Sequence, residues 1–184
     1  MGIHQIQLRF EPTADRLLLQ VRSTQAELYA VWLTRRMVGL LLPPFRQAVM
    51  ASGLQEVAPN ALPVPEAREM LAQAALARPL PGTQFNQPFQ ADEHCRYPLG
   101  PEPLLPDVGD LRRNAAGELQ LLLRETRGRH IELGLTAELS TALLRLMDSA
   151  LAAANWALPE GPGPATGPAE PPPDEHPPAG QHLN

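Results

Sequence analysis

The stretch RLLLQVRSTQAELYAVWLTRRMVGLLLPP, residues 16–44, decides the fold because a related stretch occurs 102 residues further along the chain. Shifted by that amount, it aligns without gaps with ELQLLLRETRGRHIELGLTAELSTALLRL, residues 118–146. Eight of the 29 positions are identical, and five of the eight are leucines. The other three are Arg22 with Arg124, Thr24 with Thr126, and Thr34 with Thr136. The apolar pattern agrees equally well, which indicates an internal duplication.

Each copy predicts a β-hairpin followed by a helix. Apolar residues occur at every second position in two short runs per copy, which places them on one face of a strand. These residues are Leu17, Leu19, Val21, Tyr29, Val31 and Leu33, and Leu119, Leu121, Leu123, Ile131, Leu133 and Leu135. Thr34 and Thr136 follow the second run, where a threonine can accept a hydrogen bond from an early helical amide. Residues 3–10 and 106–113 supply a candidate first strand for each copy, the second of them poorly periodic.

The pattern therefore predicts an α+β fold with a duplicated β-β-β-α unit, in which each antiparallel meander buries one face against a helix. We expect the first repeat in residues 1–53, a connecting helix and loop in 54–102, and the second repeat in 103–157. The acidic, proline-rich residues 158–184 cannot bury enough apolar surface to fold, so we expect a disordered tail. One six-stranded sheet and two packed halves are both compatible with the sequence.

The two repeat helices differ in pattern. The first begins at Arg35 and is apolar on nearly all sides through MVGLLL before Pro43 and Pro44. Because interior prolines break helices, we expect a short helix, a kink and a second helix. Its apolar turn must be covered by the other repeat or by a second subunit. The second helix is amphipathic, and Trp156 near its end should close over the core with one polar partner for its indole.

The segment between the repeats predicts a helix and a long loop. Residues 63–79 contain good helix formers with prolines at both ends. Residues 80–106 show no periodicity, which is unusual for a loop of this length in a compact domain. Its aromatic residues, among them Phe85, Phe89 and Tyr97, suggest that it packs on the domain.

Composition limits the compartment and the partners. The single cysteine, Cys95, excludes an internal disulfide framework and a cysteine-rich zinc site. The N-terminus lacks a signal-peptide pattern, and no stretch approaches the roughly 20 apolar residues of a membrane span. We therefore expect a cytoplasmic protein without a membrane partner. The net charge of −5 is uneven: residues 1–53 carry six arginines and three acids, whereas 158–184 carry four acids and no arginine.

The sequence predicts neither an enzyme nor a metal or cofactor site. It contains no phosphate-binding glycine loop, GxSxG elbow or HExxH motif. The strongest local candidate is ADEHCRY, residues 91–97, but its four adjacent acid, histidine and cysteine side chains point in different directions. We interpret it as a solvated loop. His130 is out of phase with the apolar positions of its strand and should point away from the core.

An arginine pair at a helix start is the most unusual feature. Arg35 and Arg36 oppose the positive end of the helix dipole, a local conflict of the kind found at functional sites. The sequence favours pairing of the arginines with Asp15, Glu27 or the acidic tail, and an anion site at the helix start is the alternative. With Trp32 the arginine pair forms the candidate binding edge. The second copy has Ala137 and Glu138 at the equivalent positions, so such a site belongs to one repeat.

These features favour a non-enzymatic interaction or accessory protein, such as an adaptor or assembly factor, that acts through apolar helix surfaces and the Trp32, Arg35 and Arg36 edge. We expect its partner to be another protein or a second copy of itself. The alternative is a single-stranded nucleic-acid-binding protein that uses Arg22 and Arg124 on arginine-lined sheet faces. Such binding also needs aromatic stacking platforms, and aromatic residues make up 4% of the chain.

Overall fold

The computed structural model describes residues 2–57, 65–77, 79–80, 89, 95–126 and 128–158. The first unit contains β1 (Ile3–Glu11), β2 (Arg16–Ser23), β3 (Leu28–Leu33) and α1 (Arg35–Val57). The connecting helix is α2 (Pro65–Ala77). The second unit contains β4 (Val108–Arg113), β5 (Leu119–Arg124), β6 (His130–Leu135) and α3 (Ala137–Ala154). The predicted α+β fold with two β-β-β-α units is confirmed, and the expected tail lies outside the described residues from residue 159 on.

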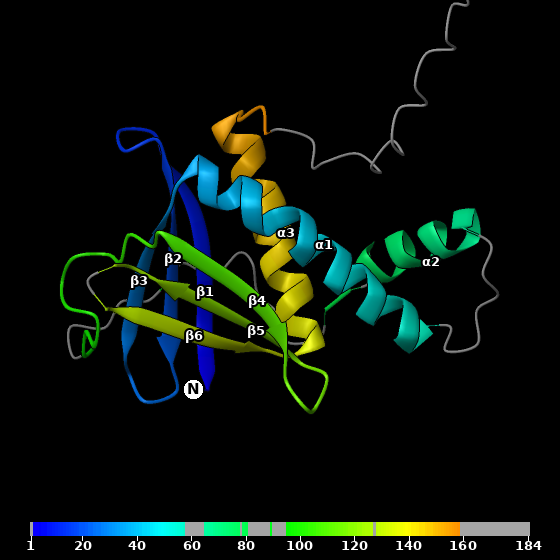
Figure 1. The fold of residues 1–184 in the computed structure, drawn as a ribbon, viewed down its shortest axis with the longest axis horizontal. Coiled ribbons are helices and arrows are strands. Elements are labelled where there is room, and N and C mark those ends of the chain that lie inside the picture. Colours follow the sequence, from blue (N-terminus) through cyan, green and yellow to red (C-terminus); the bar gives the residue numbers. More distant parts are fainter. Residues whose placement is uncertain are drawn as a thin grey trace, which may run out of the picture.

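The six strands form two separate antiparallel sheets, β1-β2-β3 and β4-β5-β6, whose inner faces meet in one core (Figure 1). The predicted hairpin registers are equivalent: Leu19 lies opposite Val31 in the first sheet, and Leu121 lies opposite Leu133 in the second. All four side chains are buried in a single hydrophobic cluster that also includes both repeat helices. Two packed halves, and not one six-stranded sheet, are therefore the architecture.

Turn conformations provide independent evidence for the duplication. Asp15 and Gly117 have positive φ angles of 47° and 83°, and Ala26 and Gly128 have 54° and 92°. Both pairs lie 102 residues apart, so the same two turn positions are left-handed in each unit. In the second unit both positions are glycines, which adopt a positive φ without strain. The first unit has Asp15 and Ala26 at these positions.

The first hairpins of the two units differ by one residue. The β1–β2 pairing ends with Glu11 opposite Arg16, whereas the β4–β5 pairing ends with Arg113 opposite Leu119. The longer turn of the second unit moves β4 by one residue relative to the repeat alignment. The burial pattern of β4 itself does not alternate, in agreement with its poor periodicity in the sequence.

Each repeat helix packs on the first strand of the other unit: α1 contacts β4, and α3 contacts β1. Gly109 in β4 permits the first of these contacts, because a Cβ atom there would lie 2.8 Å from Sδ of Met37. The helices cross where Arg46 pairs with Asp148 at 2.5 Å. These two residues occupy equivalent positions, so their contact marks the approximate two-fold axis of the duplication.

The expected break in the first helix is wrong, because α1 continues from Arg35 through Pro43 and Pro44 to Val57. Both prolines are exposed, so the backbone carbonyl groups that lose their amide partners can bind water. The other repeat covers the apolar turn of this helix, with Met37 and Leu41 packed against β4. Leu40 is the exception, with 62% of its surface exposed.

Residues 95–105 are not the structureless loop that the sequence predicts. They run parallel to the outer edge of β3, where Trp32 donates its amide to the Leu104 carbonyl at 2.7 Å and Leu104 donates to Ala30 at 2.8 Å. Arg96 pairs with Glu27 at 3.2 Å. An open strand edge needs hydrogen-bond partners, and this segment supplies them. Phe85 lies outside the described residues, Phe89 is half-buried and Tyr97 is exposed.

No helix in the described ranges is both long enough and apolar enough to cross a membrane.

Candidate functional site

Two adjoining hollows beside β3 and the start of α1 share Asp107, and we call them together the Trp32 groove. The larger, of about 530 Å³, is lined by Arg16, Trp32, Glu102, Pro103, Leu105, Asp107, Glu125, Thr126 and Arg129. The smaller, of about 140 Å³, is lined by Thr34, Arg36, Met37, Leu40, Pro106 and Asp107. The groove thus joins residues of the first unit with the segment that leads into β4.

Trp32 lies in the groove because of strand alternation. Val31 and Leu33 are buried in the core, so the side chain between them points to the opposite face of β3. The segment after Leu104 forms the facing wall, and it is fixed because Leu104 is fully buried and pairs with β3. The wall and Trp32 are therefore held at a set separation by the sheet.

Exposed apolar side chains concentrate around this groove. Leu40 and Leu105 line it with 62% and 41% of their surface exposed. Val108, with 40% exposed, lies outside the groove, opposite Arg124 in the second sheet. In the described part of the chain, only Met70 and Tyr97 are other large apolar residues with comparable exposure. Exposed apolar groups that gather at a concave surface are typical of binding sites.

The floor of the larger hollow contains a buried acid that is fully engaged. Glu125 is 8% exposed and accepts two hydrogen bonds from the Arg129 guanidinium, at 2.6 and 3.0 Å. Its hydrogen bonds to Glu125 raise the pKa of Arg129. Arg129 also donates to the carbonyls of Leu99 and Glu102, at 2.8 and 3.2 Å. The pair therefore fixes the 99–102 wall and compensates the burial of Glu125.

Asp107 carries a negative charge at the point where the two hollows meet. The hydroxyl of Thr126 donates a hydrogen bond to its carboxylate, and this bond, with the Arg124 charge as a smaller contribution, holds the pKa of Asp107 below its ordinary value. The groove thus presents an acid between Arg16 at one end and Arg36 at the other.

The structure brings together part of the predicted binding edge. Trp32 and Arg36 line the groove, but Arg35 points elsewhere and donates to the carbonyl of Ala157 at 2.6 Å. The acids predicted as partners of the arginine pair are engaged otherwise: Asp15 accepts the Trp156 indole N–H at 2.8 Å, and Glu27 pairs with Arg96. Pairing with the tail lies outside the described residues.

Arg22 and Arg124 lie on the outer faces of different sheets and do not form one surface. Arg124 is exposed, whereas Arg22 is half-buried on a face where Leu18 and Leu28 are buried. On the outer face that carries Arg124, Arg112 pairs with Asp110 at 2.5 Å. The arginine lining expected for nucleic acid is therefore divided and partly neutralised.

Arg16, Glu102 and Asp107 belong to the groove but were not predicted from the sequence. Arg16 ends one strand pairing, and the other two lie in and after the segment with no periodicity. The bonds of Leu104 to β3, of Arg129 to the Glu102 carbonyl and of Thr126 to Asp107 place these residues, and nothing in the local sequence indicates those contacts.

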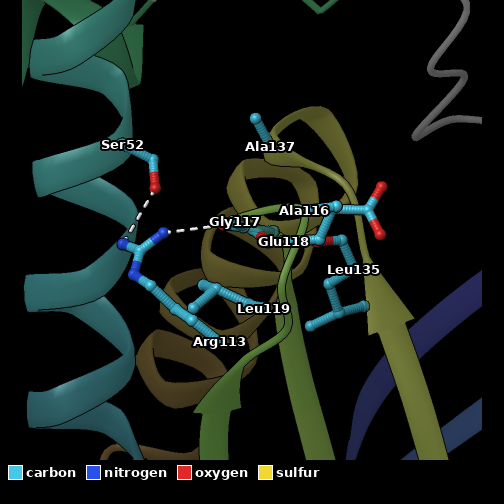
Figure 2. Close-up of a pocket in the computed structure, with 9 residues that line it drawn as sticks. Ser52, Arg113, Ala116, Gly117, Glu118, Leu119, Leu135 and Ala137 are labelled. Carbon is cyan, nitrogen blue, oxygen red and sulfur yellow. Dashed lines mark hydrogen bonds between the residues drawn. The ribbon is translucent and has the colours of Figure 1, made fainter.

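A third hollow, of about 340 Å³, lies between α1 and the start of α3 (Figure 2). Figure 2 shows Arg113 reaching across to α1, with the Glu118 carboxylate turned away from it. Arg113 donates to the Ala48 carbonyl at 2.9 Å, to Oγ of Ser52 at 3.1 Å and to the Gly117 carbonyl at 2.9 Å. Its donors are engaged within the chain, so this arginine ties the β4–β5 turn to α1.

The loop considered for metal or catalysis is mostly outside the described residues, which include only Cys95 to Tyr97 of it. Cys95 is buried. Across the part of the chain that the structure describes, no three histidine, cysteine, aspartate or glutamate side chains are grouped to hold a metal ion. His130 is exposed on β6 and points away from the core, as its phase predicts.

Comparison with known proteins gives no match to a protein-family model, a curated protein or a solved structure.

Proposed function

We propose that this is a non-enzymatic accessory protein that binds a segment of a protein partner in the Trp32 groove. The observation that carries the proposal is the pair of exposed apolar side chains, Leu40 and Leu105, in a groove lined by a tryptophan and arginines. Tryptophan and arginine are enriched at the centres of protein interfaces, where they bury a large surface and donate hydrogen bonds.

The charges of the groove favour a polypeptide over a nucleic acid. Glu102 lines the larger hollow with Arg16, and Asp107 lines both hollows, so a polyanion would meet two carboxylates as well as the guanidinium groups of Arg16 and Arg36. Nucleic-acid affinity derives largely from uniform neutralisation of phosphates by basic residues. A protein segment with side chains of both signs fits this pattern better, and nucleic acid remains an outcome of the test.

The engaged state of the polar groups favours binding over catalysis. Glu125 is held by Arg129 and Asp107 by Thr126, which leaves neither acid placed as a general base for a bound molecule. The proposal includes no cofactor. We also propose a cytoplasmic location, which the single buried cysteine supports.

The test is affinity capture from native lysate with the full chain, with and without nuclease. Leu40→Asp places a charge in the groove, and Met70→Asp is the matched control because Met70 is 72% exposed on α2. We expect Leu40→Asp to reduce capture at least about tenfold, corresponding to about 1.4 kcal/mol, with Met70→Asp equal to wild type. Both side chains are exposed, so neither change should alter stability by more than about 0.5 kcal/mol.

Equal capture by all three proteins would contradict the proposal, and so would loss of the captured material on nuclease treatment. The second result would instead favour nucleic acid. Capture of the untagged chain itself would support the proposal with a second copy as the partner.

A further inference from the structure

The outer edge of β6 has no hydrogen-bond partner among the described residues. Glu125 donates its amide to the Arg129 carbonyl just before this strand, so the odd-numbered residues of β6 direct their backbone groups to β5. The backbone groups of His130, Glu132 and Gly134 therefore point away from β5. No other strand or segment in the described ranges bonds to them.

The equivalent edge of the first unit is covered. Ala30 and Trp32, the counterparts of Glu132 and Gly134, bond to the backbone of Leu104. Both are half-buried, whereas Glu132 and Gly134 are exposed. The repeat helices pack on the first strand of each sheet, and Figure 1 shows β6 on the side of its sheet away from α1. Of the two equivalent edges, only that of β6 is open.

The edge of β6 is suited to pair with the same edge of a second copy. Unpaired N–H and C=O groups of an edge strand form a template for another strand. Two copies related by a two-fold axis pair antiparallel, and this arrangement closes because each copy uses the same edge. A Cβ atom at Gly134 would meet nothing within 4 Å, so the outer face beside this edge is unobstructed there.

The side chains of β6 select one register for such a pair. An axis through Glu132 would place two carboxylates directly opposite each other, which is unfavourable. An axis through Leu133 would place His130 opposite Thr136, beyond the end of the strand. An axis through Ile131 instead places His130 of each copy opposite Glu132 of the other, an imidazole opposite a carboxylate at two points. Each of these two residue pairs then exchanges two backbone hydrogen bonds.

The other charges on this face agree with that register. His130 lies opposite Arg124 in the β5–β6 pairing, and both side chains are exposed. A carboxylate beside His130 therefore also lies in the field of Arg124. The acids on this face, Asp107 and Asp110, lie on the β4 side of β5, away from the edge of β6.

We propose that two copies of the chain pair antiparallel through β6, with His130 of each copy beside Glu132 of the other. The two β4-β5-β6 sheets then join into one sheet across the dimer. His130, Glu132 and Gly134 do not line the Trp32 groove, so the dimer presents two grooves. Two grooves on one particle strengthen binding to a partner that carries two recognised segments. This last consequence rests on the proposed function, whereas the dimer itself does not.

The test is sedimentation equilibrium of the full chain, in which the paired side chains are exchanged. His130→Glu places two acids opposite each other and Glu132→His places two histidines opposite each other, so each should weaken the dimer about tenfold. The double variant restores both pairs with their sides exchanged, and its dissociation constant should lie within about threefold of wild type. His4→Glu on β1 and Glu66→His on α2 are the matched controls at exposed positions away from β6, and they should change nothing.

Two results would overturn the dimer. One is a wild-type chain that stays monomeric up to about 1 mM, a concentration at which even a small interface is populated. The other is a double variant that is as weak as the single variants, because the residues would then not lie opposite each other.

Amide hydrogen exchange identifies the surface independently. In the dimer the Glu132 amide donates to the other copy, so its exchange should slow as the protein concentration rises. The Leu133 amide bonds to β5 with or without the second copy and serves as the internal reference. A mass that rises with concentration while exchange at Glu132 stays constant would place the contact elsewhere and overturn the proposal.

The dimer and the proposed function fail in distinguishable ways. If the chain is monomeric but capture depends on Leu40, the proposed function stands and the dimer fails. If the dimer forms but no other protein is captured, the dimer stands and the proposed function fails. Capture of a second copy belongs to the groove if Leu40→Asp abolishes it, and to β6 if Glu132→His abolishes it.

Discussion

The starts of α1 and α3 have the same cap and different surfaces. Thr34 and Thr136 each accept a hydrogen bond from the amide three residues later, at 3.2 and 3.3 Å. Beyond the cap, α1 has Arg36 and the 62%-exposed Leu40, where α3 has Glu138 and Ala142, which is 3% exposed. The residues that shape the fold agree between the units, whereas the residues that face the groove differ. The contribution of α1 to the Trp32 groove therefore has no counterpart at the start of α3.

The largest effect should come from the core positions that the units share. Leu33 and Leu135 are equivalent and essentially unexposed. Leu33→Ala and Leu135→Ala should each lower the free energy of unfolding by about 2–5 kcal/mol, measured by urea denaturation, because each leaves a cavity. Leu40→Ala is the control, with a change of less than about 0.5 kcal/mol. A small loss at only one core position would show that the two units do not contribute alike.

Removing either of the two helix caps should lower the free energy of unfolding by a smaller amount, similar for both caps. Thr34→Ala and Thr136→Ala each remove the hydroxyl that accepts a helical amide. We expect each to cost about 1 kcal/mol in the same unfolding experiment. Thr→Ser at either position retains the acceptor and should restore most of the loss. A cost at one cap and none at the other would break the equivalence.

Changes at Arg36 and at its equivalent Glu138 should affect the free energy of unfolding and the binding of a partner differently. Arg36→Glu gives α1 the charge that α3 has, and it should raise the free energy of unfolding by about 0.5 kcal/mol through the helix dipole. The reverse change, Glu138→Arg, should lower it by a similar amount. Arg36→Glu should nevertheless reduce partner capture, and Glu138→Arg should not. Undiminished capture by the Arg36 variant would remove that arginine from the site.

The smallest effect concerns the titration of Asp107. Thr126→Ala removes the principal cause of its lowered pKa, so the pKa should rise toward its ordinary value in a carboxyl carbon NMR titration. Because the folded pKa is lowered, the stabilising contribution is present above the unfolded pKa and is lost as the pH falls through the folded pKa. The variant should therefore be less stable than wild type at neutral pH, and this difference in stability should disappear as the pH falls below the folded pKa of Asp107. Identical titration curves would show that Thr126 does not control this carboxylate.

Hydrophobic periodicity predicted much of the fold, because the alternation of residues such as Leu19 and Val31 reflects burial on one sheet face. It could not predict the one-residue shift of β4, which depends on the length of a turn. It also missed the pairing of Leu104 with β3, since that bond joins distant backbone groups and leaves no side-chain pattern. Local helix rules failed at Pro43 for a similar reason: packing on the other unit holds α1 together.

The candidate site was predictable only where it coincides with a local anomaly. Trp32 is out of phase with a buried strand, and Arg36 opposes the helix dipole, so both were found. Asp107 and Arg16 break no local rule of sequence. They are recognised as part of the Trp32 groove only from the three-dimensional structure. Arg35 shares the anomaly of its neighbour but binds the end of α3, which no local pattern could distinguish.

The most direct test of the central claim is an amide chemical-shift map of the full, ¹⁵N-labelled chain on addition of the protein recovered by capture. The account predicts that the perturbed amides cluster in residues 32–40 and 102–108, on the two walls of the groove. Perturbations confined to the outer sheet faces around Arg22 or Arg124, with the groove unaffected, would contradict it.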